Sequence, residues 1–152
     1  MKTELKLSVN TGFAVNRFSE PEVLADFCKN YLNIKFIQPT SDWLNLNMPN
    51  KFSVSQVKKI NKIFIKHNLK VNSTFTGAYT RLNHLAHPDK NHQIYWVKWF
   101  KRFIDVSEDL GAKYVGSHLG ILTYKDNNTK DRNSILIDRV IKNWWNIAEY
   151  AS

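Results

Sequence analysis

The sequence has little cysteine, glycine or proline, and it has no long apolar run. Its single cysteine, Cys28, excludes an intrachain disulfide framework and a zinc ribbon, because both need several cysteines. Five glycines and four prolines among 152 residues, with 43% hydrophobic residues, exclude collagen-like, low-complexity and disordered chains. No apolar run is long enough for a membrane-spanning helix, and Met1–Glu4 does not begin a signal peptide. We therefore expect one cytoplasmic domain over residues 1–152.

The chain carries a net charge of +9, from 22 Lys and Arg against 13 Asp and Glu. Basic surfaces attract phosphate, which suggests nucleic acid as a partner. The surplus is mostly lysine, however, whereas arginine is the residue of planar, bidentate recognition. The lysines are spread over expected helix surfaces, most densely at 58–66. We interpret the charge as solvated helix faces and do not expect a nucleic-acid partner.

One pattern occurs four times: a short alternating or β-branched run, a loop, and an amphipathic helix. The expected strands are 5–10, 34–38, 70–75 and 113–118. Capping boxes at 19–22 and 53–56 predict two helix starts, and Gly111 predicts a left-handed residue after the third helix. A polar loop, 125–133, precedes the fourth helix. No linker divides the series, so we expect one domain.

Apolar stripes predict which side of each helix is buried. In chain order they are Val23, Leu24, Phe27, Cys28 and Tyr31; Val57, Ile60, Ile63 and Phe64; Val97, Phe100, Phe103, Ile104 and Val106; and Ile137, Val140, Ile141, Trp144, Trp145 and Ala148.

Alternating strands and helices predict an α/β fold with a parallel sheet. An open doubly wound sheet and part of a (β/α)8 barrel both fit, because both place long loops after their strands. The turn after the first strand, 10–16, holds one glycine, and the sequence contains no Walker loop. We therefore favour the barrel, as a parallel (β/α)4 half with four βα units.

Polar residues end each expected strand, and the parallel topology gathers them at one rim. They are Asn10, Gln38, Thr74 with Thr76, and Ser117 with His118. We expect them to face a common substrate, although residues at strand ends also serve to satisfy backbone groups. His118 is the leading catalytic candidate, since the flanking Gly116 and Gly120 allow a ligand to approach. It suits a metal ligand, a general acid/base or a hydrogen-bond donor, or else a core histidine.

Other candidates lie in the loops that follow the strands. His84 and His87 have the spacing of helix-borne ligands, but no third ligand follows, and His67 suits a helix C-terminus. Asp42 either caps its loop or reaches the substrate, and Trp43 either stacks on a sugar or packs on the rim. Arg17 and Arg81 either hold an anionic group such as phosphate or lie solvated at the surface. Cys28 is expected to be buried and inert.

Three stretches resemble sugar-phosphate isomerases and epimerases of the xylose-isomerase-like TIM-barrel superfamily, in particular the erythrulose-phosphate group. They are 38–45, 74–77 with 83–88, and 115–120. The resemblance spans nearly the whole chain and implies a sugar-phosphate substrate. It also implies a divalent metal (Mn, Mg, Co or Zn) that assists proton transfer next to a carbonyl.

Only the first half of the family's rim has counterparts here. The resemblance carries over to Asn10, Thr11, Thr76 and His84 as substrate-binding residues and to His118 as a catalytic residue and metal ligand. From their places at the rim, we also expect Gln38, Trp43 and Arg81 to bind substrate. The two Glu, the Asp and the His that supply most of the family's metal ligands come from later strands and have no counterpart. The chain therefore corresponds to the N-terminal half of a barrel.

A half-barrel leaves its first and fourth strands as unpaired edges. We therefore expect self-association or pairing with a C-terminal half. Two other functions stay open: a non-catalytic binding or assembly module, and a relative of the metal-dependent apurinic endonucleases.

Overall fold

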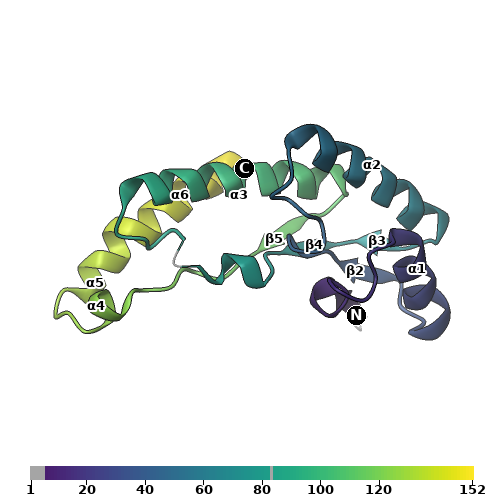
Figure 1. Ribbon diagram of the computed structural model, residues 1–152, viewed down its shortest axis with the longest axis horizontal. Coiled ribbons are helices and arrows are strands. Elements are labelled where there is room, and N and C mark those ends of the chain that lie inside the picture. Colours follow the sequence, from purple (N-terminus) through teal and green to yellow (C-terminus); the bar gives the residue numbers. More distant parts are fainter. Residues whose placement is uncertain (1–5, 83) are drawn as a thin grey trace, which may run out of the picture. The chain divides into compact units, whose positions relative to one another are not determined.

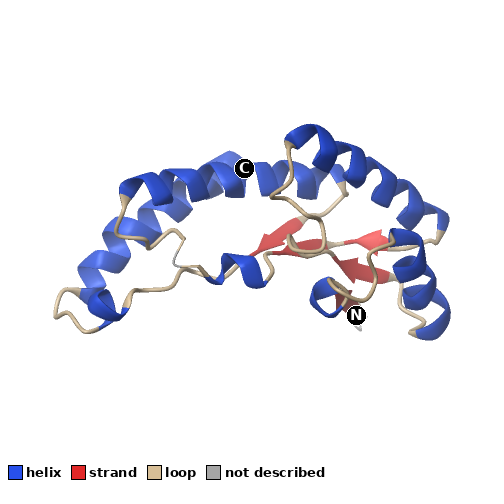
Figure 2. Ribbon diagram, in the orientation of Figure 1, coloured by secondary structure: helices blue, strands red, loops and turns tan. Residues whose placement is uncertain are grey.

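The computed structural model describes residues 6–82 and 84–152 (Figure 1). The chain forms two compact units, one of residues up to Gly77 with Val106–Gly116, and one of Ala78–Asp105 with Ser117–Ser152. All described strands belong to the first unit, and the second is built from helices and loops (Figure 2). The expectation of a single domain stays a prediction.

The strands of the first unit pair in parallel throughout. They are β1 (Ser8–Asn10), β2 (Phe36–Gln38), β3 (Lys70–Val71), β4 (Ser73–Phe75) and β5 (Tyr114–Gly116). The order is β1-β2-β3 and β4-β5, and a parallel bridge joins Thr40 to Phe75. The expected third strand is thus divided at Asn72, and β1 and β5 lie at the outer edges. This confirms the predicted parallel α/β architecture.

The first two main helices begin at other residues than the capping boxes predicted. Helix α1 (Pro21–Asp26) continues as the π-helix η2 (Phe27–Tyr31), and its N-cap, Glu20, makes no side-chain capping bond. Helix α2 (Asn50–Lys66) starts after Pro49, so Ser53 lies inside the first turn and its Oγ donates to the Met48 carbonyl. Both boxes were wrong, because each helix begins at or directly after a proline whose fixed φ already suits a helix start. A 3₁₀ turn, η1 (Thr11–Phe13), follows β1.

The second unit holds η3 (Ala78–Arg81) and most of α3 (Lys90–Asp109). Helix α4 (Tyr124–Asn127) follows, and then α5 (Arg132–Ile135), the π-helix η4 (Leu136–Ile141) and α6 (Lys142–Ala151) run on without a break. We call this run, 132–151, the last helix. The expected polar loop at 125–133 was wrong in part, because Thr123 caps α4 by accepting from the Asp126 N–H.

Each turn from a helix to the next strand contains a single left-handed residue: Asn33 (φ 51°), Asn68 (φ 60°) and Gly111 (φ 79°). After α2 and α3 the pattern is the Schellman motif. The Leu69 N–H donates to the Phe64 carbonyl at 2.8 Å, and the Ala112 N–H donates to the Ser107 carbonyl at 2.9 Å. The prediction for Gly111 is confirmed.

The predicted stripes are buried only in part. Val57, Ile60 and Phe64 of α2 are buried as predicted. Cys28 is buried too, and burial raises the pKa of its thiol to about 11. The stripes of the first and last helices were wrong at their exposed members, which are Val23, Tyr31, Ile137, Ile141, Trp145 and Ala148. Among the described residues, no helix is both long and apolar enough to cross a membrane.

Candidate functional site

The predicted strand-end residues of β1 and β2 contact each other. Asn10 Nδ2 donates to Gln38 Oε1 at 2.8 Å, and Gln38 Nε2 donates to Ser73 Oγ, also at 2.8 Å. Asn10 Oδ1 accepts from the Gly12 N–H. Parallel pairing of Asn10 with Gln38 explains this row, because both end their strands at the same register. Ser73 was not predicted, since it begins β4 instead of ending it.

Two of the predicted substrate ligands are buried. Thr11 Oγ1 accepts from the Thr40 N–H at 2.8 Å and lies 3.1 Å from Thr40 Oγ1. The Thr76 N–H donates to the Gly116 carbonyl at 3.0 Å. These bonds favour a role in joining strand ends, and substrate contact by Thr11 or Thr76 stays a prediction.

Asp42 packs against the main chain of Gly77. A Cβ atom at Gly77 would overlap the Asp42 carboxylate, and the Gly77 N–H donates to Ser41 Oγ at 3.2 Å. The absence of a side chain at Gly77 therefore allows the loop after β2 to lie against the end of β4. This close approach favours the loop-holding role of Asp42.

Trp43 is buried beside Phe64, with the ring centroids 6.0 Å apart and the planes at 7°. Its Nε1–H donates to the Phe18 carbonyl at 2.9 Å. This placement favours packing at the rim over stacking on a sugar, and its substrate contact stays a prediction. Arg17 donates to the Phe13 carbonyl at 3.1 Å.

In the helical unit, His84 is fully buried between aromatic rings of α3. Its ring centroid lies 5.7 Å from that of Trp96 and 5.5 Å from that of Phe100. His84 Nδ1 accepts from the Leu85 N–H at 2.7 Å. Burial, and to a lesser extent the charge of His118, lowers the pKa of His84 to about 4. The ring is therefore neutral at pH 7.

The tautomer of His84 follows from the same hydrogen bond. Since Nδ1 is an acceptor, the proton of the neutral ring lies on Nε2. Nε2 is buried and has no hydrogen-bond partner among the described residues. An unsatisfied buried N–H is rare and costs about 1–3 kcal/mol, so this donor is suited to an oxygen acceptor.

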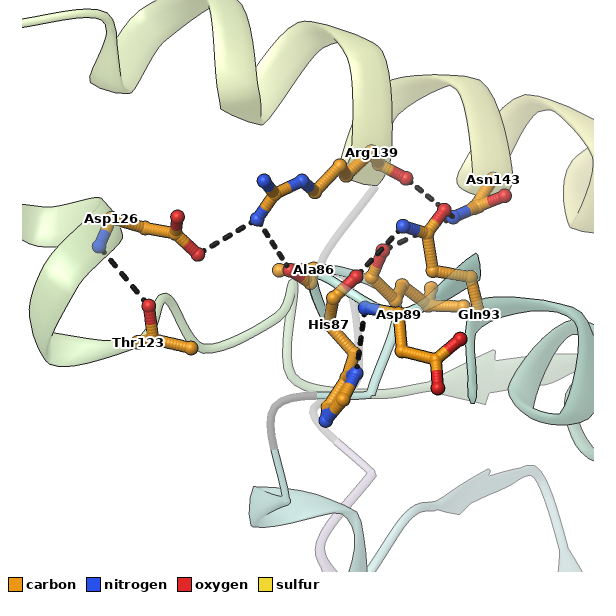
Figure 3. Close-up of polar contacts among 9 residues, drawn as sticks. Ala86, His87, Asp89, Gln93, Thr123, Asp126, Arg139 and Asn143 are labelled. Atoms are coloured by element: carbon orange, nitrogen blue, oxygen red, sulfur yellow. Dashed lines mark hydrogen bonds and ion pairs between the residues drawn. The ribbon is translucent and has the colours of Figure 1, made fainter. Parts of the chain in front are cut away.

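A polar network holds the three residues that follow His84 (Figure 3). Three consecutive carbonyls each accept from a side chain: Leu85 from Asn143 Nδ2 at 3.1 Å, Ala86 from Arg139 Nη1 at 3.4 Å, and His87 from Gln93 Nε2 at 2.7 Å. Arg139 also pairs with Asp126 at 2.7 Å. No motif in the sequence predicted this network. Its only signal was the four-residue spacing of Arg139 and Asn143, which places both on one helix face.

The remaining candidates of the helical unit lie apart from this network or beside it. Arg81 is exposed on η3, where a charged group is accessible to an anion. His118 is half-buried after β5. The rings of His87 and His92 stack with centroids 3.9 Å apart, and His87 Nδ1 accepts from the Asp89 N–H.

The described residues do not fit a divalent metal by themselves. No three His, Cys, Asp or Glu side chains among residues 6–82 and 84–152 lie together as a ligand group. His84 already uses Nδ1 as an acceptor, so its Nε2 carries the proton of the neutral ring. A metal centre at this rim therefore requires ligands beyond the described residues.

Comparison with models of known protein families gives no match. The D-erythrulose 1-phosphate 3-epimerase of Brucella abortus is 36% identical over 148 residues, which is 97% of this chain and 48% of that protein. A crystal structure from Rhodospirillum rubrum, described as a xylose isomerase, superposes with a TM-score of 0.88 at 28% identity. The superposition covers 97% of this chain and 50% of the R. rubrum chain.

A xylose isomerase-like TIM-barrel protein from Mycobacterium smegmatis, in complex with magnesium, superposes with a TM-score of 0.57 at 16% identity. The match covers 96% of this chain and 52% of the other. At that identity it shows the fold alone.

The fold of the chain corresponds to about half of a xylose isomerase-like TIM barrel. The chain spans about half the length of the curated relative it matches, and its parallel strands and helices agree with that share. The predicted resemblance to sugar isomerases and epimerases is confirmed.

Proposed function

We propose that the chain provides half of the active site of a sugar-phosphate isomerase or epimerase. The observation that carries this proposal is the 36% identity, over nearly the whole chain, to a relative named as an erythrulose-phosphate epimerase. The reaction moves a proton at the carbon next to a carbonyl. A base removes that proton, the electron pair forms an enediolate, and a proton then returns to the same or the neighbouring carbon.

The residues of this chain supply binding groups and one acid/base candidate. Asn10 and Gln38, already joined by a hydrogen bond, present amide groups to sugar hydroxyls. The neutral ring of His84 donates a hydrogen bond from its Nε2–H to a substrate oxygen. The exposed Arg81 pairs with the phosphate of the substrate. His118 is the acid/base candidate, because an imidazole transfers protons near neutral pH.

A second half-barrel completes the site. The carboxylates that the family resemblance assigns to the metal and to proton removal have no counterpart here, and the described residues contain no three-ligand group. We propose that the partner half, a C-terminal half or a second copy, contributes them. The complete site, with both halves present, determines which sugar and stereochemistry it accepts and which metal it holds.

Turnover of tetrulose phosphates tests the proposal. The chain is assayed alone and with a C-terminal half of the B. abortus relative, each with Mn²⁺ or Mg²⁺ and after chelation. We expect turnover in the completed protein and a loss of at least about 100-fold in His118→Gln. His92→Gln, an exposed histidine, is the matched control. No turnover with either metal in the completed protein would contradict the enzyme function.

A second candidate, a binding half-module without chemistry, is favoured by the missing ligand group among the described residues. Calorimetry with a ketose phosphate separates the two functions. The binding module would be supported if the completed protein binds the ketose phosphate without turning it over and if His84→Phe abolishes this binding.

A further inference from the structure

The last of the four main helices exposes a row of apolar side chains four residues apart, and the first exposes two apolar side chains on either side of the half-buried Phe27. In the first helix the row is Val23, Phe27 and Tyr31, which we call the first-helix ridge. Val23 is 51% exposed and Tyr31 is 79% exposed, and the rings of Phe27 and Tyr31 stack with centroids 5.0 Å apart. Residues four apart share one helix face, so the three side chains form a continuous surface.

The last helix repeats this arrangement with Ile137, Ile141 and Trp145, the last-helix ridge. Their exposures are 57%, 54% and 72%. The same helix buries Val140, Asn143 and Ile147, so it has one buried face and one face on which these three apolar side chains are mostly exposed.

The second and third helices show no such ridge in the described residues. Their exposed large apolar side chains are Phe52, Val54 and Ile65 on α2, and Ile94 and Tyr95 on α3. No two of them on one helix are four residues apart. In a (β/α)8 barrel each helix packs between two neighbours, and halving the barrel removes one neighbour from the first and the last helix only. The ridges occur on those two helices.

We propose that two copies of this chain associate by packing the first-helix ridge of one copy on the last-helix ridge of the other. The inference rests on the pairing of half-barrels in the proposed function. Length agrees with a second copy, because the chain spans 48% of its curated relative and two copies match one full barrel. The outer strands β1 and β5 supply the matching open edges.

Charge favours this pairing over first-helix against first-helix contact. Segment 20–31 has Glu20, Glu22 and Asp26 against Lys29, in a chain whose net charge is +9. Each of the other main helices has more basic than acidic residues. Two first helices would repel each other, whereas a first and a last helix would not. A pair of chains makes this contact twice, so both ridges of each chain are covered and the assembly stops at two copies.

Sedimentation velocity of the 152-residue chain over a concentration series tests the inference. We expect a species with the mass of two 17.8-kDa chains. Tyr31→Asp or Trp145→Lys should raise the dissociation constant of the pair at least about 100-fold, since each places an unpaired charge at both contacts. The matched control is Ile65→Lys on α2, whose side chain is 70% exposed, and it should leave the constant unchanged.

A charge swap tests which helices meet. Mixing the Tyr31→Asp chain with the Trp145→Lys chain leaves one contact apolar and joins aspartate to lysine in the other. We expect association within about 10-fold of the unaltered chain, because the opposite charges compensate each other.

Four results would each overturn the inference. They are a monomer at all concentrations, an open polymer, a mixture of the two variants that stays dissociated, and an Ile65→Lys chain whose pair is weakened as much as that of the ridge variants. Association with a C-terminal half but not with a second copy would overturn it too. Sedimentation does not depend on turnover, so failure here is distinct from failure of the enzyme function.

Discussion

Helix α3 and the last helix hold the same loop differently: α3 packs aromatic rings on it and adds one hydrogen bond from Gln93, whereas the last helix contacts it through hydrogen bonds. Helix α3 places the rings of Trp96 and Phe100 against His84, which removes water from the imidazole. The last helix uses Asn143 and Arg139 on the carbonyls that follow. Apolar contact therefore sets the ionisation of the histidine, and polar contact fixes the main chain that carries it. The last helix also buries Val140 and Ile147, and it exposes Ile137, Ile141 and Trp145.

The largest expected effect is on the apolar side of this comparison. Phe100→Ala should lower the free energy of unfolding by about 3–5 kcal/mol, because Phe100 is fully buried and its ring also contacts Trp144 at 4.9 Å. Trp145→Ala, on the exposed face, should change it by no more than about 0.5 kcal/mol in the dissociated chain. Urea unfolding followed by circular dichroism measures both. Equal losses would show that the exposed face is packed within one chain.

The next effect concerns the pH dependence of stability. The pKa of His84 is about 4 in the folded chain against 6.5 for an ordinary histidine. The unfolded chain therefore binds more protons between these values, and stability falls as the pH drops from 6.5 to 4. The loss approaches about 3 kcal/mol. Urea midpoints across this range measure it.

His84→Gln should flatten this pH profile, and His92→Gln should leave it unchanged. Histidine NMR gives an independent readout, since the tautomer of His84 should carry its proton on Nε2. A His84 resonance that titrates near pH 6.5 would contradict the buried, neutral ring.

The smallest effect tests the polar side of the comparison. Asn143→Ala should cost about 1–3 kcal/mol locally, because the Leu85 carbonyl and Gln93 Oε1 both lose a donor. Amide hydrogen exchange should become faster in residues 85–87 and stay unchanged in α2. Lys142→Ala, an exposed neighbour, is the control. Unchanged exchange would mean that the rings of α3 suffice to hold the loop.

The sequence was enough to predict the parallel architecture, because four repeats of strand, loop and helix leave few topologies. The turn at Gly111 was predictable because glycine adopts a positive φ without steric cost. The helix starts were not, since prolines preceded or overlapped both capping boxes. The exposure of Ile137, Ile141 and Trp145 was also missed, because an exposed apolar ridge has the same period as one that faces a core.

At the candidate site, parallel register made the contact between Asn10 and Gln38 foreseeable. The burial of Thr11, Trp43 and His84 was not, because polarity at a strand end does not reveal which groups the neighbouring strand offers. The network around Arg139 and Asn143 joins residues more than 50 positions apart in sequence. No local pattern encodes such a contact.

The turns that lead from a helix to the next strand tolerate insertions less well than the loops that follow the strands. Asn33, Asn68 and Gly111 each close a turn with one left-handed residue, so an inserted residue there would rotate the next strand and turn its side chains to the wrong face. The loops after the strands also contain left-handed residues, Asn45 (φ 52°) and Gly120 (φ 145°), but each leads into a helix and does not set the register of the next strand. Insertions and deletions can therefore accumulate more readily in the loops after the strands than in the turns before them, while the sheet keeps its register.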